Sequence, residues 1–285
     1  MVVSLLNKLA LHSRFKNRLI NKGAHSKVWF GIMTVVTGLF IFNASVANAG
    51  DAKTLLVGLS AEYRPLAYKE DGKLTGIEPA TAKELGKLLN KTITFKEYPW
   101  AELIPALESG AIDVIMSGMS VTKERSHRVS FTQSYLDIGQ MAIIRKSDIA
   151  RLSQSRAMFK QGMRIGVEPE TTGESYVKEY AGEAELKPYQ NPAQGFKALQ
   201  NQEIDFFVHD APTSWNMAQG SEWPDLMALY TPLTKESLAW AVSRNNSALL
   251  DSLNEALLKL EAAGTLKQIQ YHWIPVKIEI ERGAK

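Results

Sequence analysis

The chain has 285 residues, 45% of them hydrophobic, which is enough for one large or two medium domains with ordinary cores. Its net charge of +3 originates in residues 1–49, which carry six Lys and Arg and leave 27 basic against 30 acidic residues in the remainder. The remainder therefore lacks the positive charge that favours nucleic-acid binding. Cysteine is absent, which excludes disulfides, thiolate chemistry, Cys-containing zinc sites and a lipid-modified Cys.

The N-terminal segment has the three parts of a secretory signal peptide. A basic stretch precedes the apolar run from Val28 to Phe42, and Ala47-Asn48-Ala49 follows before Gly50. The run of 15 residues is shorter than the roughly 20 that span a bilayer as a helix. We expect cleavage after Ala49 and a periplasmic mature protein. An uncleaved N-terminal anchor is the alternative, favoured by the long basic stretch.

Short apolar strands alternate with helical patterns along the rest of the chain. Strands are predicted over residues 55–59, 92–95 and 112–116, and helices over 78–89, 100–108 and 247–260. Gly110 closes the second helix as a C-terminal cap. The alternation predicts α/β folding with mostly parallel sheets.

A near-repeat links two segments about ninety residues apart. Residues 106–115 (ALESGAIDVI) and 198–207 (ALQNQEIDFF) share a helix end, a polar turn, Ile-Asp and an apolar strand. The pattern indicates two lobes of the same plan, although helix-turn-strand units are common enough for one such match to arise by chance. Ligands of α/β sheets collect beyond the carboxyl ends of strands, where Ser117 to Ser120 and His209-Asp210 stand. If the lobes face each other, these strand ends share a cleft.

Arg125 follows a segment rich in small and hydroxyl residues, Ser117-Gly118-Met119-Ser120, and a helix start at Thr122. Backbone N–H groups at a helix start and an Arg side chain form a carboxylate receptor. A capped surface helix with a solvated Arg fits the same pattern.

Asp210 stands alone after the apolar strand Phe206-Phe207-Val208, where burial is costly without a cationic partner such as an ammonium group. An Asp that caps the turn before Pro212 is the alternative. Together, Arg125 and Asp210 match both poles of a zwitterion. Tyr63 and Trp100 are candidate aromatic walls of the cleft, although a Trp at a helix start usually covers core.

Catalytic and metal-binding motifs are not found in the sequence after residue 49, which contains His127, His209 and His272 without metal-ligand spacing. Glu174 is a candidate general acid, and a first-turn helix acid explains it equally well. We therefore expect no catalytic residue, no metal and no cofactor.

With these residues in view, the sequence after the leader resembles the family 3 periplasmic solute-binding proteins of amino-acid ABC transporters. The resemblance covers nearly all of residues 55–274 and is strongest in WAELIPALESGAIDVIMSGMSVTKER (100–125), followed by Ser130-Phe131-Thr132 and Tyr135. Supporting matches are GIE (76–78), GV (166–167), TTG (171–173), HD (209–210), AGT (263–265) and Trp273.

The resemblance implies a two-lobed type II periplasmic-binding-protein fold. Lobe 1 is expected over residues 50–142 and 238–285 and lobe 2 over 143–237, with two crossing strands near 143–144 and 238–240 as the hinge. The expected ligand-binding residues are Tyr63, Trp100, Ser117, Gly118, Ser120, Arg125, Thr171, Thr172 and Asp210. In the family, the matching Arg holds the α-carboxylate with the hydroxyl at Ser120 and the Thr171-Thr172 loop. The Asp210 position holds the α-ammonium, and the Tyr63 aromatic stacks on the ligand side chain.

The implied function is capture of an amino acid by a monomeric protein that closes about its hinge and delivers the ligand to a membrane ABC permease. Gly118 replaces a hydroxyl found in some members. Ser60 stands where members for basic or amide side chains often carry Asp, which disfavours Lys or Arg as the ligand and leaves polar, acidic and aromatic ligands open. The alternative is a cyclohexadienyl dehydratase, an enzyme similar in fold that acts on prephenate or arogenate, with Glu174 at its Glu position. A sensor domain released from a membrane receptor is a third interpretation.

Overall fold

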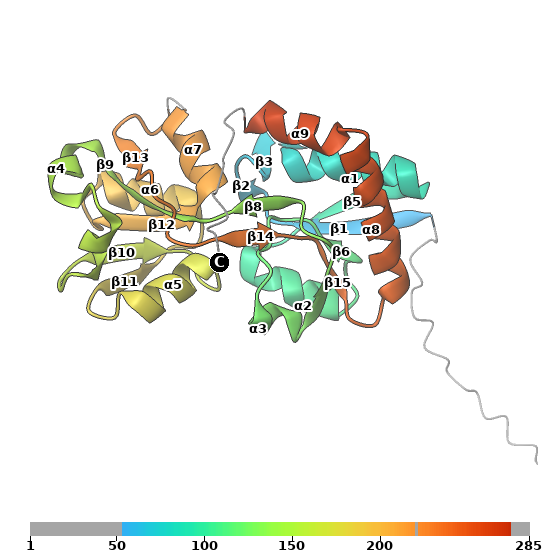
Figure 1. Ribbon diagram of the computed structural model, residues 1–285, viewed down its shortest axis with the longest axis horizontal. Coiled ribbons are helices and arrows are strands. Elements are labelled where there is room, and N and C mark those ends of the chain that lie inside the picture. Colours follow the sequence, from blue (N-terminus) through green and yellow to red (C-terminus); the bar gives the residue numbers. More distant parts are fainter. Residues whose placement is uncertain (1–52, 220–221, 275–285) are drawn as a thin grey trace, which may run out of the picture. The chain divides into compact units, whose positions relative to one another are not determined.

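The computed structural model describes residues 53–219 and 222–274. The expected signal peptide and its cleavage site lie outside these residues. The described chain builds two five-stranded sheets, each with helices on both faces, and Figure 1 shows the strands β8 and β14 between them. Within the described residues, no helix combines the length and apolarity needed to cross a membrane.

The first sheet has the strand order β5-β1-β6-β15-β7. Its strands are β1 (Thr54–Leu59), β5 (Thr92–Glu97), β6 (Val114–Ile115), β7 (Val129–Phe131) and β15 (Ala241–Ser243). Strand β1 pairs in parallel with β5 and β6, and β15 runs antiparallel to both β6 and β7. The last strand of this sheet therefore returns from the far end of the chain.

The second sheet repeats this plan in the order β11-β10-β12-β9-β13. Its strands are β9 (Gln140–Arg145), β10 (Arg164–Val167), β11 (Glu185–Pro188), β12 (Phe206–Asp210) and β13 (Leu226–Ala228). Strand β10 pairs in parallel with β11 and β12, and β9 is antiparallel to β12 and β13. The two segments of the near-repeat end in β6 and β12, which hold the same third place in their sheets. The expectation of two lobes of one plan is confirmed.

Helices cover both faces of the first sheet. One core joins the sheet to α1 (Ile77–Leu89), α8 (Ser247–Ala262) and α9 (Thr265–Trp273). The opposite core joins it to η1 (Trp100–Glu102) and α2 (Leu103–Glu108), and α3 (Lys123–Ser126) follows β6. The single predicted helix over 100–108 is split because Pro105 has no N–H to donate to the carbonyl of residue 101, so a 3-10 turn precedes α2.

The second sheet is covered in the same way. One core includes α4 (Ile149–Leu152), η3 (Ser155–Phe159) and α5 (Thr172–Tyr180), and the other includes α6 (Pro192–Gln200) and α7 (Ala211–Gln219). Phe206 and Val208 enter the first core and Phe207 enters the second, because successive side chains of a strand point to opposite faces. Burial on both faces explains why this strand reads as a continuous apolar run.

Two segments pass between the sheets and pair with each other. Strand β8 (Leu136–Ile138) is antiparallel to β14 (Glu236–Leu238). Residues 143 and 144, expected near the first crossing, lie inside β9 in the second sheet, so the chain crosses a few residues earlier. A three-stranded sheet of β2 (Glu62–Tyr63), β3 (Ala67–Glu70) and β4 (Lys73–Thr75) follows β1.

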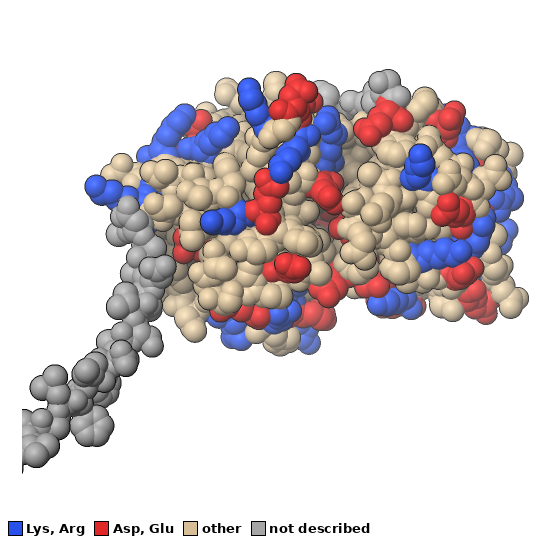
Figure 2. All heavy atoms as spheres, turned by 180° about the vertical axis from the view of Figure 1, so that it is seen from behind, with Lys and Arg blue, Asp and Glu red and all other residues tan. Residues whose placement is uncertain are grey.

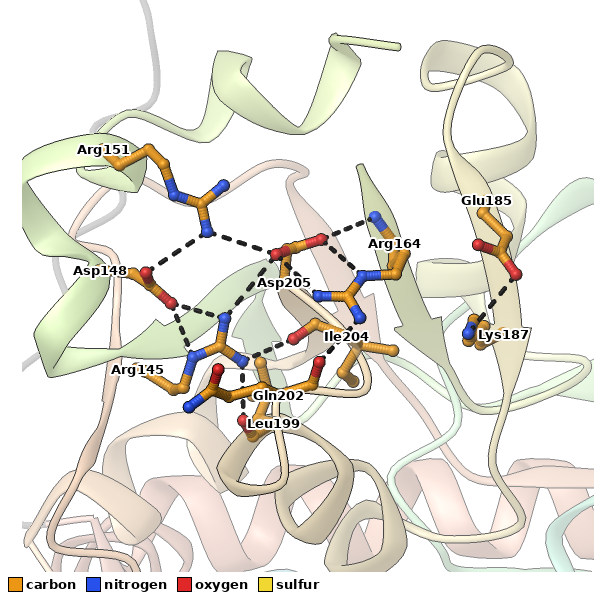
Figure 3. A network of polar contacts seen from close by, with 10 residues as sticks. All are labelled: Arg145, Asp148, Arg151, Arg164, Glu185, Lys187, Leu199, Gln202, Ile204 and Asp205. Carbon is orange, nitrogen blue, oxygen red and sulfur yellow. Dashed lines mark hydrogen bonds and ion pairs between the residues drawn. The ribbon is translucent and has the colours of Figure 1, made fainter. Parts of the chain in front are cut away.

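Charged side chains of both signs are interspersed on the face shown in Figure 2, without an extended patch of one sign. The second lobe also contains a buried ion network (Figure 3). Asp205 accepts hydrogen bonds from the backbone and guanidinium of Arg164, and it lies 3.7 Å from Arg145. Arg145 is paired with Asp148 in η2 (Lys146–Asp148) at 2.5 Å. This network ties η2, β9 and β10 to the turn that precedes β12.

Candidate functional site

A pocket lies between the carboxyl ends of strands from both sheets. Strands β1 and β6 of the first sheet and β10 and β12 of the second all end at it. Its lining residues are Ser60, Glu62, Tyr63, Trp100, Gly118, Ser120, Arg125, Gln140, Glu168, Thr171, Thr172, Pro192, His209 and Asp210. Eight of the nine residues expected to bind ligand are among them. Residues far apart in the sequence thus meet at the strand ends, as expected for ligand sites of α/β sheets.

Ser117 is the ninth, and it does not line the pocket. Its side chain is buried, and its Oγ accepts a hydrogen bond from the backbone N of Ser60 at 2.9 Å. The hydroxyl therefore holds the end of β1 beside the end of β6, where Ser60 reaches the pocket.

Gly118 lines the pocket at a position where the backbone conformation and the neighbouring side chains leave no room for a larger residue. Its φ of 65° lies in the left-handed region, and a Cβ built on it would stand 2.5 Å from Cε1 of Tyr63. The backbone N–H of Gly118 donates to the buried carboxylate of Glu78 at 2.8 Å. Glu78 also accepts hydrogen bonds from Tyr135 and Trp240, and burial raises its pKa above the ordinary value. The buried carboxylate of Glu78 and its hydrogen-bond partners thus hold the turn at Gly118 in place.

Arg125 extends from α3 into the pocket, and the N-cap at Thr122 is confirmed, since its Oγ1 accepts from the backbone N of Arg125 at 3.1 Å. Its Nη1 donates to the carbonyl of Ser120 at 2.9 Å and its Nη2 to the carbonyl of Glu170 at 3.0 Å. Burial lowers the pKa of Arg125, and the charges of Asp210, Glu236 and Glu170 oppose that shift. A guanidinium has five N–H donors, so these two bonds leave donors for a carboxylate.

Trp100 and Arg125 together form a wall of the pocket. The guanidinium carbon lies 5.1 Å from the centroid of the Trp100 ring, and Trp100 Nε1 donates to the carbonyl of Glu170 at 3.2 Å. Both side chains thus bond one carbonyl of the loop that precedes α5. Trp100, Arg125, Thr171 and Thr172 also line an outer cavity of about 530 Å³, so they separate it from the pocket.

Asp210 lies at the end of β12, in the second lobe, whereas Arg125 belongs to the first lobe. Its carboxylate accepts hydrogen bonds from the hydroxyl of Tyr63 and from Nε2 of Gln140. Burial raises the pKa of Asp210 above its ordinary value, and the nearby carboxylate of Glu236 acts in the same direction. A cation that reaches this carboxylate would therefore meet a desolvated partner.

Thr171 and Thr172 begin α5 and have separate roles. Thr171 caps the helix, accepting from the backbone N of Glu174 at 3.1 Å and donating to the carbonyl of Glu168 at 2.7 Å. Thr172 Oγ1 donates to Glu236 at 2.8 Å and accepts from Nε2 of Gln140 at 2.9 Å. The Glu174 carboxylate accepts from the backbone N of Glu170 and pairs with Lys178, and it is not part of the pocket lining.

Sequence reasoning missed several lining residues, above all Gln140, Glu168 and the side chain of His209. Glu168 follows β10 directly, so the strand-end rule applied to that strand would have found it. Gln140 begins an antiparallel strand, and nothing in the local sequence marks it.

His209 is buried beside Phe207 and Tyr63 in the pocket wall. Its Nε2 lies 3.4 Å from the carboxylate of Glu168, and its buried Nδ1 has no hydrogen-bond partner among the described residues. Burial acts to lower the pKa of His209, but the hydrogen bond to Glu168 and the charges of Asp210 and Glu168 outweigh it and leave the pKa raised. This wall therefore offers both an acceptor and a donor to a polar group.

The pocket is too small for an amino acid. Its cavity volume is about 30 Å³, room for only a few water molecules. An amino acid therefore enters only if the lining side chains or the two lobes move apart. Within the described segments, no three His, Cys, Asp or Glu side chains are grouped to hold a metal ion.

The two lobes of one plan, the paired crossing strands and the pocket at the strand ends define a binding protein of the type II periplasmic class. The sequence model for bacterial extracellular solute-binding proteins, family 3, matches residues 55–276, and the chain belongs to that family. The expected resemblance and fold class are confirmed.

Relatives with assigned names are amino-acid-binding proteins. The chain is 30% identical to the ABC transporter arginine-binding protein 1 of Escherichia coli (strain K12) over 86% of this chain and 98% of that protein. It is 27% identical to the ABC transporter glutamine-binding protein of Bacillus subtilis (strain 168), over 81% of this chain and 84% of that protein. A protein of Neisseria gonorrhoeae named "Probable histidine-binding protein" is also 27% identical, over 80% of this chain and 85% of that protein.

Solved structures show the same likeness. An ancestral arginine-binding protein bound to glutamine superposes with a TM-score of 0.74 at 29% identity, covering 79% of this chain and all of that one. The ancestral amino-acid-binding protein AncCDT-1, described as a precursor of cyclohexadienyl dehydratase, gives a TM-score of 0.73 at 29% identity over 78% and 95%.

Proposed function

We propose that this protein captures an amino acid between its two lobes and delivers it to a membrane ABC permease. The observation that carries the proposal is the presence of Arg125 and Asp210 in one pocket, since they come from different lobes and match the two poles of a zwitterion. A ligand that contacts both lobes favours the arrangement in which they are close.

In this proposal, Arg125 binds the α-carboxylate beside Ser120 and the Thr171-Thr172 loop, and Asp210 binds the α-ammonium. The hydroxyl protons of Ser120 and Thr172 are donated to Glu236, so the charged donors for the carboxylate come from Arg125. Tyr63 and Trp100 supply aromatic walls. The ligand side chain extends toward Glu168 and His209. The lobes expected from the sequence are residues 50–142 with 238–285, and residues 143–237. We move their first boundary to the end of β8, because β9 (Gln140–Arg145) belongs to the second sheet, and the chain changes lobe along β8 and β14.

The protein is further proposed to act as a monomer in the periplasm, after export and cleavage following Ala49. This location fits a family described as extracellular. It is tested by the N-terminal sequence of the protein recovered from a periplasmic extract.

The decisive test is a thermal-shift screen of the protein starting at Gly50 against the twenty amino acids and cystine. A ligand that binds only the folded state raises Tm in proportion to the logarithm of its concentration over Kd. The relatives named for arginine, cystine, glutamine and histidine make these four the first compounds to test. The presence of Ser60 disfavours arginine, whereas the carboxylates of Glu62 and Glu168 in the lining favour a basic side chain, so the screen decides between them. No shift with any amino acid would refute the proposal.

The cyclohexadienyl dehydratase is the second candidate, favoured by the likeness to AncCDT-1. The engagement of Glu174 with Glu170 and Lys178, outside the pocket lining, speaks for a protein that is not an enzyme. Incubation with prephenate or arogenate tests this directly. Formation of phenylpyruvate or phenylalanine, lost in Glu174→Gln, would establish the enzyme instead.

A further inference from the structure

Glu236 stands at the start of β14, in one of the two segments that pass between the lobes, and no family motif singled it out. Backbone hydrogen bonds join the segment around Glu236 to both lobes. The N–H of Val121 donates to the carbonyl of Ser237 at 2.9 Å, and the N–H of Leu233 donates to the carbonyl of Gln140 at 2.7 Å. The side chain of Glu236 is thereby placed between the ends of the two lobes.

One oxygen of Glu236 accepts hydrogen bonds from hydroxyls of both lobes. Ser120 Oγ, from the loop after β6, donates to Oε2 at 2.5 Å, and Thr172 Oγ1, from the first turn of α5, donates to the same Oε2 at 2.8 Å. The other oxygen, Oε1, accepts from Thr234 Oγ1 at 2.5 Å. Because a single atom receives both hydroxyls, separation of the lobes must break at least one of these bonds.

These bonds are part of a chain that starts and ends in the first lobe. From Ser120 it passes through Glu236 to Thr172, then through Nε2 of Gln140 to Asp210, and from Asp210 to the hydroxyl of Tyr63. Charge-assisted bonds are the strong ones, and both carboxylates in this chain are acceptors. Such networks stabilise one arrangement of their members more than isolated pairs do.

We propose that Glu236 is a positioning residue that stabilises the closed arrangement of the lobes from the connecting strand. It also fixes the hydroxyls of Ser120 and Thr172, since each hydroxyl has one proton and donates it to Glu236. The inference rests on the proposed function only where it predicts that Glu236 changes the affinity for an amino acid. Its effect on the lobe-to-lobe distance is independent of which ligand is bound.

A competing electrostatic effect gives the opposite sign. Glu236 is an acid close to Arg125, so it would repel a ligand carboxylate bound there. If repulsion dominated, neutral variants would bind an amino acid more tightly. If positioning dominates, they bind more weakly, because more of the free energy of binding is used to close the lobes.

The chain has no cysteine, so two introduced cysteines can be spin-labelled without competition from native ones. Lys259 on α8 and Lys197 on α6 are exposed and lie in different lobes, and Lys259→Cys with Lys197→Cys provides the label pair. Double electron–electron resonance then gives the distance distribution between the lobes. It is measured without added amino acid and with saturating L-arginine, L-glutamine, L-histidine or L-cystine.

Glu236→Ala is expected to shift this distribution toward longer distances and to raise Kd about tenfold, as loss of a bond to a charged group implies. Glu236→Gln retains one acceptor oxygen and is expected to fall between wild type and Glu236→Ala. Ser237→Ala is the matched control, since the neighbouring hydroxyl bonds Asp137 outside the pocket, and it should leave both readouts unchanged.

An unchanged distance distribution in Glu236→Ala, or tighter binding by Glu236→Gln, would overturn the proposal. If Glu236→Ala does not fold, Thr172→Val, which removes one of the two hydroxyls at nearly constant shape, must produce the same lengthening without ligand. If wild type responds to no amino acid, the proposed function fails, and Glu236 is judged on the distance distribution alone.

Discussion

The hydroxyl of Tyr63 on β2 donates a hydrogen bond to the carboxylate of Asp210 at the end of β12, across 147 residues of sequence. This bond joins the first lobe to the second inside the pocket. Burial and the charge of Asp210 raise the pKa of Tyr63 well above its ordinary value, so the phenol stays protonated and remains a donor. The carboxylate proposed for the ligand ammonium is therefore already oriented by the proposed aromatic wall.

Amino-acid affinity should rise with pH through the titration of Asp210. Its pKa is raised by burial in the folded protein, and only the ionised carboxylate attracts an ammonium. Calorimetric titration with the amino acid that gives the largest thermal shift, between about pH 4 and pH 8, measures this slope. Asp210→Asn should weaken binding about 30-fold or more and flatten the slope. An equal slope in Asp210→Asn would assign it to His209, whose pKa is also raised.

The stability of the unliganded protein should change with pH in the opposite direction. Asp210 and Glu78 both have raised pKa values when folded, so the folded state holds their protons more tightly than the unfolded state. The resulting stabilisation is complete below the ordinary pKa values of 3.8 and 4.5 and is lost as pH rises through the raised ones. The free energy of unfolding by urea, measured across this range, should decrease more with pH in wild type than in Asp210→Asn.

Arg125→Ala should reduce amino-acid affinity about 100-fold or more, because a buried ligand carboxylate loses its charged partner. Arg128→Ala is the matched control. Arg128 lies three residues further along and makes an exposed pair with Glu108 at 2.6 Å. We expect wild-type affinity in the control and little change in Tm for either variant. Wild-type affinity in Arg125→Ala would show that the carboxylate binds elsewhere.

Gly118→Ala and Gly110→Ala form a pair that separates backbone strain from pocket damage. Both glycines have positive φ, 65° and 74°, so either Ala costs about 1 kcal/mol of stability. Only at position 118 does the new Cβ approach Tyr63 and Leu66, each at 2.5 Å, whereas at 110 no atom lies within 4 Å. Gly118→Ala should lose more stability to urea than Gly110→Ala, because overpacking against Leu66 and Tyr63 adds to the backbone strain, and only Gly118→Ala should lose ligand affinity, through displacement of Tyr63.

Asp205→Ala should destabilise the second lobe by about 3 kcal/mol without a direct effect on binding, because it leaves Arg145 and Arg164 without their shared partner (Figure 3). Burial acts to raise the pKa of Asp205, but hydrogen bonds from Arg164 outweigh it and leave the pKa lowered. The stabilisation is thus fully present above the ordinary pKa of 3.8 and is lost as pH falls from there through the lowered pKa of the folded state. Urea unfolding at pH 7 and pH 3 measures the loss, which should shrink at the lower pH.

Much of the architecture is predictable from the sequence because it follows from local patterns. The apolar strand runs, the helix caps and the near-repeat indicate two α/β lobes of one plan. The rule that ligands gather at strand ends leads from Ser117–Ser120 and His209-Asp210 to a shared cleft. Arg125 is singled out by the hydroxyl-rich segment and the helix start before it, and Asp210 by its place after an apolar strand, where a buried charge needs a partner. Both are properties of the local sequence.

Other features depend on contacts between distant segments, which no local pattern encodes. Ser117 looks like a pocket residue, but its hydroxyl points inward and accepts from the N–H of Ser60, 57 residues away. Gln140 and Glu236 carry no sequence signal, because each becomes part of the site only when the crossing segments bring Ser120 and Thr172 together. The sequence alone indicated two lobes and the charged residues Arg125 and Asp210, because local patterns carry them. Tertiary packing decided which polar groups form hydrogen bonds between the lobes, because those bonds join distant segments.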